Sequence, residues 1–204
     1  MIKTASILME EYKCYGAPKN KISRMVSSGG LIKIVRGLYE TSADTPGYVL
    51  AASIYNPSYL SFEYALSVRG LIPEKVFAFT SATFDKQKKK SYENHFGTFT
   101  YQDVPQEAFP LDIIIEKEGS YYYPMATAEK ALCDMLYKLS PARNQKELTS
   151  LIFDFLRIDE RSFYDLDMKK IAYLADRYHS TNLKLLKRIV KRNDKTNNQT
   201  DKEL

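Results

Sequence analysis

The chain has few of the residues on which catalytic and metal sites usually depend. Its 204 residues include two cysteines, two histidines and eight glycines. Cys14 and Cys133 lack the paired spacing of a zinc site and the density of a disulfide scaffold, so we expect both to be reduced, buried thiols. His95 and His179 lie far apart, and neither has a neighbouring ligand at metal spacing. We therefore expect no metal and no cofactor.

Long apolar runs and phosphate-binding loops are also absent. No stretch approaches the roughly 18 consecutive apolar residues of a membrane span. Glu10 and Glu11 interrupt the apolar N-terminal segment, as they would not in a signal peptide. The pair Gly29-Gly30 and the single glycines lack the strand-loop-helix spacing of a phosphate cradle. These absences favour a cytoplasmic protein without a membrane partner.

The segment most similar to a catalytic cluster is "TAEKALCD", which begins at Thr127. It places Glu129, Lys130 and Asp134 close together, as an acid–base pair requires. Glu129, however, falls in the first turn of a predicted helix, where a negative charge suits the helix dipole. Lys130 and Asp134 have the i,i+4 spacing of an ion pair. We therefore expect a structural role here, no catalytic residues, and no enzymatic activity.

Positive charge is concentrated at the N-terminus. Residues 1–39 hold seven lysines or arginines and two glutamates, whereas the remaining 165 residues hold 23 charges of each sign. The whole formal net charge of +5 therefore lies in the first fifth of the chain. Lysine and arginine side chains replace the counterions condensed on nucleic-acid phosphates, so a basic patch confined to one module is typical of nucleic-acid binding.

The basic segment predicts two helices. Residues 2–15 have a helical pattern, which Gly16-Ala17 ends. Pro18 suits the first turn of a second helix that continues to about Ser28, because its missing N–H would be unbonded there in any case. The apolar side chains of this second helix recur at i, i+3 and i+4 and should face the core: Ile22, Met25 and Val26.

The opposite face of this helix is polar, and it predicts contacts with DNA in the major groove. Its side chains are suited to hydrogen bonds with base edges: Asn20, Ser23, Arg24 and Ser27. Lys19 and Lys21 flank them and should contact phosphates. A solvated helix face has the same pattern, so the segment that follows decides between the two interpretations.

That segment, residues 31–40, predicts a β-hairpin with a basic tip. Ile32 and Ile34 alternate with Lys33, and the chain turns at Arg36-Gly37. A hairpin directly after a basic helix indicates a winged helix-turn-helix, in which Lys33 would contact a phosphate. Arg36 would contact a phosphate or the minor groove, where arginine is favoured if the groove is narrow.

The turn-rich segment "TSADTPG", residues 41–47, separates this module from a neutral remainder. We expect a winged helix-turn-helix over residues 1–45, an α+β domain over 46–192 and a disordered tail over 193–204. The expected helices of the second domain cover about residues 48–54, 61–68 with Ser61 as cap, 127–139, 148–156, 168–178 and 183–190. Its expected strands cover about residues 76–81, 97–103 and 112–116, the last paired with 121–123. The fold class is therefore α+β, with a helical C-terminal part.

Two parts of the chain resemble a known family. "NKISRMVSSGGLIKIVRGLYE" resembles the winged helix that opens AbiEi-type antitoxins. "SYLSFEYALSVRGLIPE" followed by "MATAEKALCDMLY" resembles the signature of the domain after it, so the resemblance covers about residues 15–140. It implies the antitoxin of a type IV AbiE toxin-antitoxin system, which acts in abortive infection as a phage defence. Such a protein represses its own operon by binding double-stranded operator DNA, and it counteracts a partner toxin similar to nucleotidyltransferases.

Two further basic segments have no assigned role. The run Lys86, Lys88, Lys89 and Lys90 is compatible with a solvated loop or with a second phosphate contact. In the last helix, Leu183, Leu186 and Val190 form a stripe suited to packing. Its other side is basic and suits packing at the surface or contact with nucleic acid or a toxin: Lys184, Lys187, Arg188, Lys191 and Arg192.

Three functions remain at this point. The first is a DNA-binding autorepressor and antitoxin, and the second is a winged-helix regulator whose α+β domain senses a ligand and has no antitoxin role. The third, an enzyme with a DNA-binding arm, is disfavoured because no catalytic constellation is found. A neighbouring reading frame that encodes a nucleotidyltransferase-like protein would distinguish the first from the second.

Overall fold

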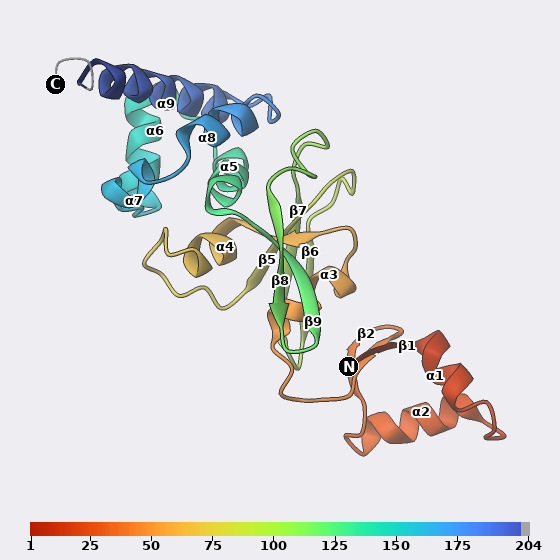
Figure 1. Cartoon of the computed structure of the whole chain (residues 1–204). Helices are drawn as coiled ribbons and strands as arrows, with labels where there is room; N and C mark the ends of the chain where they lie inside the picture. The colour runs from red at the N-terminus through yellow and green to blue at the C-terminus, as the bar shows by residue number, and fades with distance from the viewer. Residues whose placement is uncertain (201–204) are drawn as a thin grey trace.

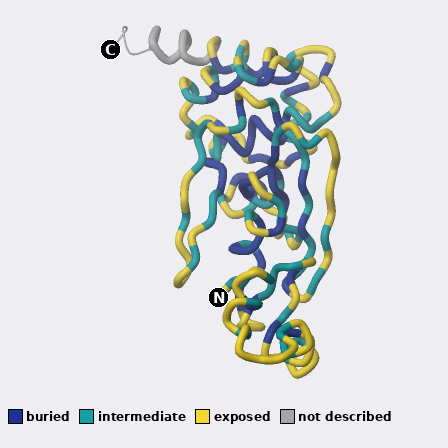
Figure 2. The backbone as a smooth tube through the Cα atoms, turned by 90° about the vertical axis from the view of Figure 1, so that its right-hand side faces the viewer, coloured by how far each residue is buried: buried dark blue, intermediate teal, exposed yellow. Residues whose placement is uncertain are grey.

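The computed structural model describes the backbone of residues 1–200 and the side chains of residues 1–191. The chain forms a small N-terminal module, residues 1–40, and a larger part in which helices pack beside a six-stranded sheet (Figure 1). This confirms the predicted α+β class. The buried residues lie mainly in the larger part, whereas most residues of the small module are exposed or half-buried (Figure 2).

The N-terminal module contains two helices and a three-stranded antiparallel sheet of order β1-β3-β2. In chain order the elements are β1 (Ile2–Thr4), α1 (Ala5–Glu11), α2 (Pro18–Ser27), β2 (Ile32–Val35) and β3 (Leu38–Glu40). The predicted helix over residues 2–15 was wrong at both ends. Thr4 has an extended backbone, and its side chain accepts a hydrogen bond from the N–H of Ile7, so the helix begins after it. Ile2 lies instead opposite Glu40 in the sheet.

The predicted second helix and hairpin are confirmed. Ile22 is buried with Leu8 and Leu31 in the core of the module, and Met25 and Val26 pack against them. The hairpin turns at Arg36-Gly37, where Gly37 has a φ of +81°, a conformation that a side chain would disfavour.

The larger part begins with short helices and the strands of the main sheet. These are η1 (Gly47–Leu50), α3 (Ala51–Ile54), β4 (Tyr59–Leu60), α4 (Phe62–Val68), β5 (Phe79–Thr83), β6 (Lys90–Asn94), β7 (Gly97–Asp103), β8 (Ile113–Glu118) and β9 (Tyr121–Ala126). The strand order is β6-β7-β5-β4-β9-β8, with both parallel and antiparallel neighbours. The predicted strands did not include β4 or β6. The lysine run was expected to be a loop, but its last residue, Lys90, is the first residue of β6.

The C-terminal part is helical, as expected. It comprises α5 (Ala128–Lys138), α6 (Gln145–Ser150), the π-helical segment η2 (Leu151–Phe155), α7 (Glu160–Tyr164), α8 (Met168–Ala175) and α9 (Thr181–Thr200). Leu183, Leu186 and Val190 of α9 are buried, which confirms the packing stripe. A disordered tail was expected over residues 193–204, but α9 continues to Thr200, so residues 193–200 are helical. Residues 201–204 lie outside the described part of the chain.

A fully buried ion pair lies where helix α5 meets the sheet. Lys130 and Asp134 are both 0 % exposed, and Lys130 Nζ lies 3.0 Å from Asp134 Oδ1. Lys130 also donates to the carbonyl of Ala108 at 2.7 Å and to the hydroxyl of Tyr178 at 2.6 Å. The expected i,i+4 pair therefore exists, but in the interior, where a charge is costly unless partners surround it.

The Asp134 carboxylate is fully supplied with donors. Ser61 Oγ donates to Oδ2 at 2.6 Å and Tyr59 at 2.9 Å, while Tyr178 donates to Oδ1 at 2.6 Å. Burial, followed by the charge of Asp134, raises the pKa of Tyr59 and Tyr178 well above 10, so both phenols remain protonated donors. Ser61 was expected to cap α4 through its side chain, but that side chain donates to Asp134 instead.

We expect Lys130→Met to lower the free energy of unfolding by about 3–5 kcal/mol, because it leaves Asp134 charged and buried without its cation. Urea denaturation at neutral pH measures the change. Lys187→Met is the control, since Lys187 pairs with the half-exposed Asp176 and should cost about 0–1 kcal/mol. Equal costs for the two variants would contradict a structural role for the buried pair.

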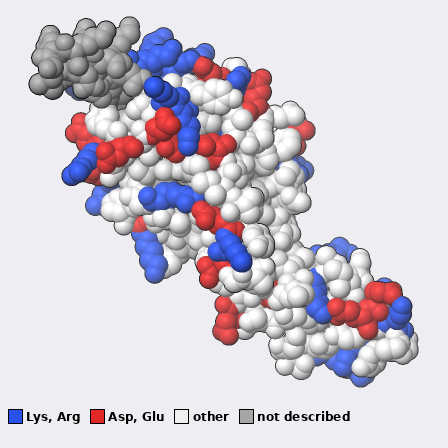
Figure 3. Space-filling view, in the orientation of Figure 1, with Lys and Arg blue, Asp and Glu red and all other residues white. Residues whose placement is uncertain are grey.

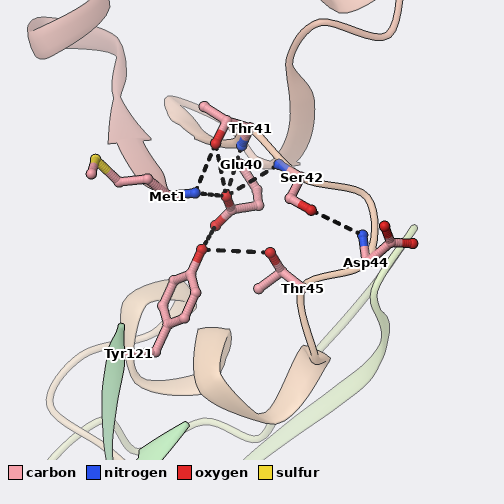
Figure 4. A network of polar contacts seen from close by, with 7 residues as sticks. All are labelled: Met1, Glu40, Thr41, Ser42, Asp44, Thr45 and Tyr121. Carbon is pink, nitrogen blue, oxygen red and sulfur yellow. Dashed lines mark hydrogen bonds and ion pairs between the residues drawn. The ribbon is translucent and has the colours of Figure 1, made fainter. Parts of the chain in front are cut away.

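The N-terminal module meets the larger part at a buried carboxylate, Glu40 (Figure 4). Its Oε1 accepts hydrogen bonds from the amino group of Met1 and from the N–H groups of Thr41 and Ser42, and its Oε2 accepts from Tyr121 of β9 at 2.9 Å. The carboxylate therefore joins the last strand of the module to the main sheet.

A second contact lies beside this one. Ile34 of β2 is buried in the core of the larger part, and its carbonyl accepts a hydrogen bond from Asn94 Nδ2 of β6 at 3.0 Å. The strand register shifts between Lys33 and Val35, so Ile34 occupies a bulge. The two parts of the chain thus share both a polar and an apolar contact.

Burial raises the pKa of Glu40, but the hydrogen bonds from the terminal amino group, Tyr121 and the Thr41 N–H outweigh it, so the pKa lies below 4.5. Because folding favours the ionised form, its stabilisation is complete above about pH 4.5 and is lost as the pH falls through the lowered pKa. We expect Glu40→Gln to lower the free energy of unfolding by about 1–3 kcal/mol at pH 7.

The difference between Glu40→Gln and the unmodified chain should shrink as the pH falls below about 4.5, because protonation removes the same charge. Denaturant titrations at several pH values measure this difference. Glu74→Gln is the control, because Glu74 pairs with Arg157 at the surface. A difference that stays constant with pH would contradict a charged Glu40 at the junction.

Candidate nucleic-acid interface

Helix α2 and the β2–β3 hairpin carry the side chains that the sequence analysis selected. Lys21 is half-buried, and the others are exposed: Lys19, Asn20, Ser23, Arg24, Ser27, Lys33 and Arg36. Since Ile22 holds one side of α2 against the core, the exposed side chains occupy the remaining circumference of the helix. Six of these eight side chains line one of two depressions in the surface of the module.

The first depression is a groove of about 380 Å³ between α1, α2 and the sheet. Lys19 and Ser23 of α2 line it together with Lys33 of β2. Its other walls are mainly apolar: Ala5, Met9, Ile22, Val26 and Tyr39. The fold thus brings Lys33 to the same groove as two residues of α2, which sequence spacing alone does not establish.

The second depression is a cleft of about 250 Å³ at the connection between α1 and α2. Asn20, Lys21 and Arg24 line it, together with Tyr15. The Lys21 ammonium lies 5.2 Å from the centre of the Tyr15 ring, a cation–π contact that explains why Lys21 is only half exposed. Tyr15 was missed from sequence, although an aromatic residue within a basic segment was a usable signal.

Ser27 and Arg36 line neither depression. Ser27 Oγ donates to the carbonyl of Ser23 at 3.1 Å, so it can offer a ligand only an acceptor unless that bond breaks. Arg36 stands at the hairpin turn, next to Gly37, whose carbonyl accepts a hydrogen bond from the N–H of Ala5 at 2.8 Å. The turn is therefore held against the start of α1.

The acidic residues of helix α1 neutralise only part of the module's charge. Lys3 binds Glu11 at 2.6 Å, and Lys13 pairs with Glu10. Among the described residues, no ion-pair partner is found for the other five cations: Lys19, Lys21, Arg24, Lys33 and Arg36. Blue side chains are visible on several sides of the module in Figure 3, beside one red cluster. The five cations remain available to an anionic partner.

The two cysteines differ from each other. Cys133 is buried in α5, as expected, and burial raises the pKa of its thiol. Cys14 is exposed, so the expectation of burial was wrong for it. Cys14 lies in the connection that follows α1, outside the apolar stripe of that helix, so it has no core to enter.

Metal clusters and membrane-spanning helices are both missing from the described residues. No group of three or more histidine, cysteine, aspartate or glutamate side chains is placed to hold a metal ion there. Within the same residues, no helix has both the length and the apolar composition needed to cross a membrane.

Comparisons with known proteins add a fold relationship. No protein-family model matches the chain, and no curated protein sequence matches it either. Its structure is similar to the crystal structure of the RV2827C protein from Mycobacterium tuberculosis, with a TM-score of 0.50 and 14% sequence identity. The match covers 92% of this chain and 75% of that chain. At this identity the likeness concerns the fold alone.

Proposed function

We propose that this protein is a cytoplasmic DNA-binding transcriptional autorepressor and the antitoxin of an AbiE-like toxin-antitoxin system. The DNA-binding half is supported by five cations on α2 and the hairpin for which the described residues offer no ion-pair partner. They surround the polar side chains of one helix, in a module whose other two lysines are already neutralised by glutamates. Such a surface suits a duplex, whose phosphates flank readable base edges.

In this proposal the module acts as a winged helix-turn-helix, with α2 as the helix that enters the major groove. Two helices joined by a short connection and followed by a hairpin support it. Arg24 and Asn20 line one cleft of α2 and are the residue types that read guanine and adenine. Lys19 and Lys33, on the other side of α2, would contact phosphates.

The antitoxin half of the proposal has a different support. It rests on the resemblance of residues 58–74 and 125–137 to the AbiEi domain signature. In the structure these segments surround the buried pair of Lys130 and Asp134, with Tyr59 and Ser61 from the first segment. The proposed partner is a nucleotidyltransferase-like toxin. The competing proposal, a regulator that only senses a ligand, would leave cells unprotected against such a toxin.

We expect Arg24→Ala to weaken operator binding by about 1–3 kcal/mol and to relax specificity at one base pair, because a base contact is lost. Lys33→Ala should weaken binding to all DNA sequences alike and reduce the slope of log affinity against log salt by about 1. Fluorescence anisotropy with operator and random duplexes at several salt concentrations measures both effects.

Lys75→Ala serves as the control. Lys75 is exposed on the larger part, and its substitution removes the same charge as Lys33→Ala. Affinity that does not change with salt would overturn the DNA-binding proposal. Equal losses on operator and random DNA for Arg24→Ala would overturn its base-reading role.

Repression and toxin neutralisation should be separable in the full chain. The triple variant Arg24→Ala, Lys33→Ala and Arg36→Ala should fail to repress the operon promoter and still protect cells from the toxin, because the two halves of the proposal use different residues. A promoter reporter and a toxin co-expression assay measure the two outcomes. The full chain is preferable to a truncation, since Ile34 and Glu40 join the two parts.

The matched control carries Lys75→Ala, Lys117→Ala and Lys146→Ala, three exposed lysines outside the module. It should retain both activities. If the Arg24, Lys33 and Arg36 variant loses protection together with repression, neutralisation depends on DNA binding and the division is wrong.

A further inference from the structure

The larger part of the chain has a pocket of its own, about 360 Å³ in volume. It lies where strands β5, β6 and β7 meet Phe62 of α4 and Lys138 of α5. Most of the lining side chains are basic, hydroxyl or amide groups: Lys89, Lys90, Thr80, Ser91, Thr100 and Gln102. The volume is at the low end of the roughly 300–1,000 Å³ that small-molecule sites occupy.

A row of hydroxyl groups crosses one face of the sheet at this pocket. Thr80 of β5 is the direct partner of Thr100 of β7, which in turn lies opposite Ser91 of β6. Direct partners point to the same face, so the three side chains stand in line at the strand spacing of about 4.8 Å. Gln102 follows Thr100 by two residues and shares that face.

Most of these polar groups have no protein partner. The Thr80 hydroxyl donates to the carbonyl of Ser61 and accepts from the N–H of Tyr64. For Thr100, Ser91 and Gln102, by contrast, no side-chain hydrogen bond to another described residue is found. The pocket therefore presents two hydroxyls and an amide, each able to donate to a ligand.

The charge at the pocket is positive. Lys138 pairs with Glu63, so it is already neutralised. Lys89 and Lys90 are exposed, and no ion pair with a described residue is found for either of them. The loop before them is held in place by Asp103, whose Oδ2 accepts the N–H groups of Lys86 and Gln87 at 2.8 and 2.6 Å. The Asp103 carboxylate is therefore hydrogen-bonded to the loop backbone.

We propose that this pocket binds a small molecule that carries a phosphate group. Lys89 contacts the phosphate, and the hydroxyls of Ser91 and Thr100 and the amide of Gln102 donate to its oxygens. Lys90 is the direct partner of Tyr101, so its side chain starts on the opposite face of the sheet, and it adds positive charge from the edge of the pocket. A phosphate offers several acceptor oxygens at once, which matches a cation beside a row of donors better than a single acceptor would. The site uses none of the eight residues of the nucleic-acid interface, so it goes beyond the proposed function.

Its position favours a small ligand over duplex DNA. Strand β6 contacts the N-terminal module at Asn94, its last residue, whereas the pocket is at Lys90, its first residue. The two therefore lie at opposite ends of the strand. A pocket that Phe62 and Lys138 close on one side suits a compact ligand better than an extended DNA duplex.

Isothermal titration calorimetry on the full chain tests the proposal, with inorganic phosphate, pyrophosphate and ATP as probes. We expect saturable binding of at least one probe, weakened about tenfold or more by the double variant Lys89→Gln and Lys90→Gln. Thr100→Val, which keeps the shape of the side chain but removes its hydroxyl, should weaken binding several-fold. The charge-matched control is Lys75→Gln and Lys88→Gln, exposed lysines outside the pocket lining, which should bind normally.

Three results would overturn the proposal. One is that no probe binds more tightly than about 1 mM. Another is that the control double variant weakens binding as much as Lys89→Gln and Lys90→Gln do, which indicates unspecific attraction. The third is that a single-stranded oligonucleotide binds at Lys89 and Lys90 while none of the small probes does. Operator binding by the same variants is measured in parallel, so failure of this site is distinguishable from failure of the DNA-binding proposal.

Discussion

The larger part of the molecule depends on the buried pair of Lys130 and Asp134. Its hydrogen-bond partners come from three segments: Tyr59 of β4, Ala108 before β8, and Tyr178 after α8. One ion pair on α5 therefore connects helices and sheet. A buried charge tolerates little displacement of its partners, because each lost hydrogen bond leaves an uncompensated group in the interior. The apolar core around it adds packing complementarity, which also favours a single arrangement. We regard this network as the constraint that sets the position of α5 relative to β4.

The second constraint is the junction at Glu40. The module contributes only Leu8, Ile22 and Leu31 as buried core residues, whereas Ile34 enters the core of the larger part. A module of about 40 residues seldom has enough core to fold alone. Its sheet is therefore supported from outside by Tyr121, Asn94 and the apolar environment of Ile34. Strand β2, which follows α2 in the chain, pairs with β3, and β3 ends at the junction.

Periodicity and turn chemistry predicted α2, the hairpin and most helices of the larger part, because those segments follow local rules. Where long-range contacts decide, the prediction failed. Residues 2–4 pair with β3, a partner 36 residues away, and β4 has only two residues, too few for any pattern. The edge strand β6 is mostly exposed and has one aromatic side chain, Tyr92, among four polar residues, so it lacks apolar alternation. Spacing revealed the Lys130–Asp134 pair but not its burial, and it revealed the interface residues but not their division between a groove and a cleft.

The bulge at Ile34 has an evolutionary consequence. Because this residue enters a core that belongs to the rest of the chain, the N-terminal module is not a unit that recombination can exchange freely. A transplanted module would carry an exposed isoleucine and a carboxylate without its tyrosine partner. A lineage of such proteins can then change the outer face of α2 more easily through point substitutions than through replacement of the whole module.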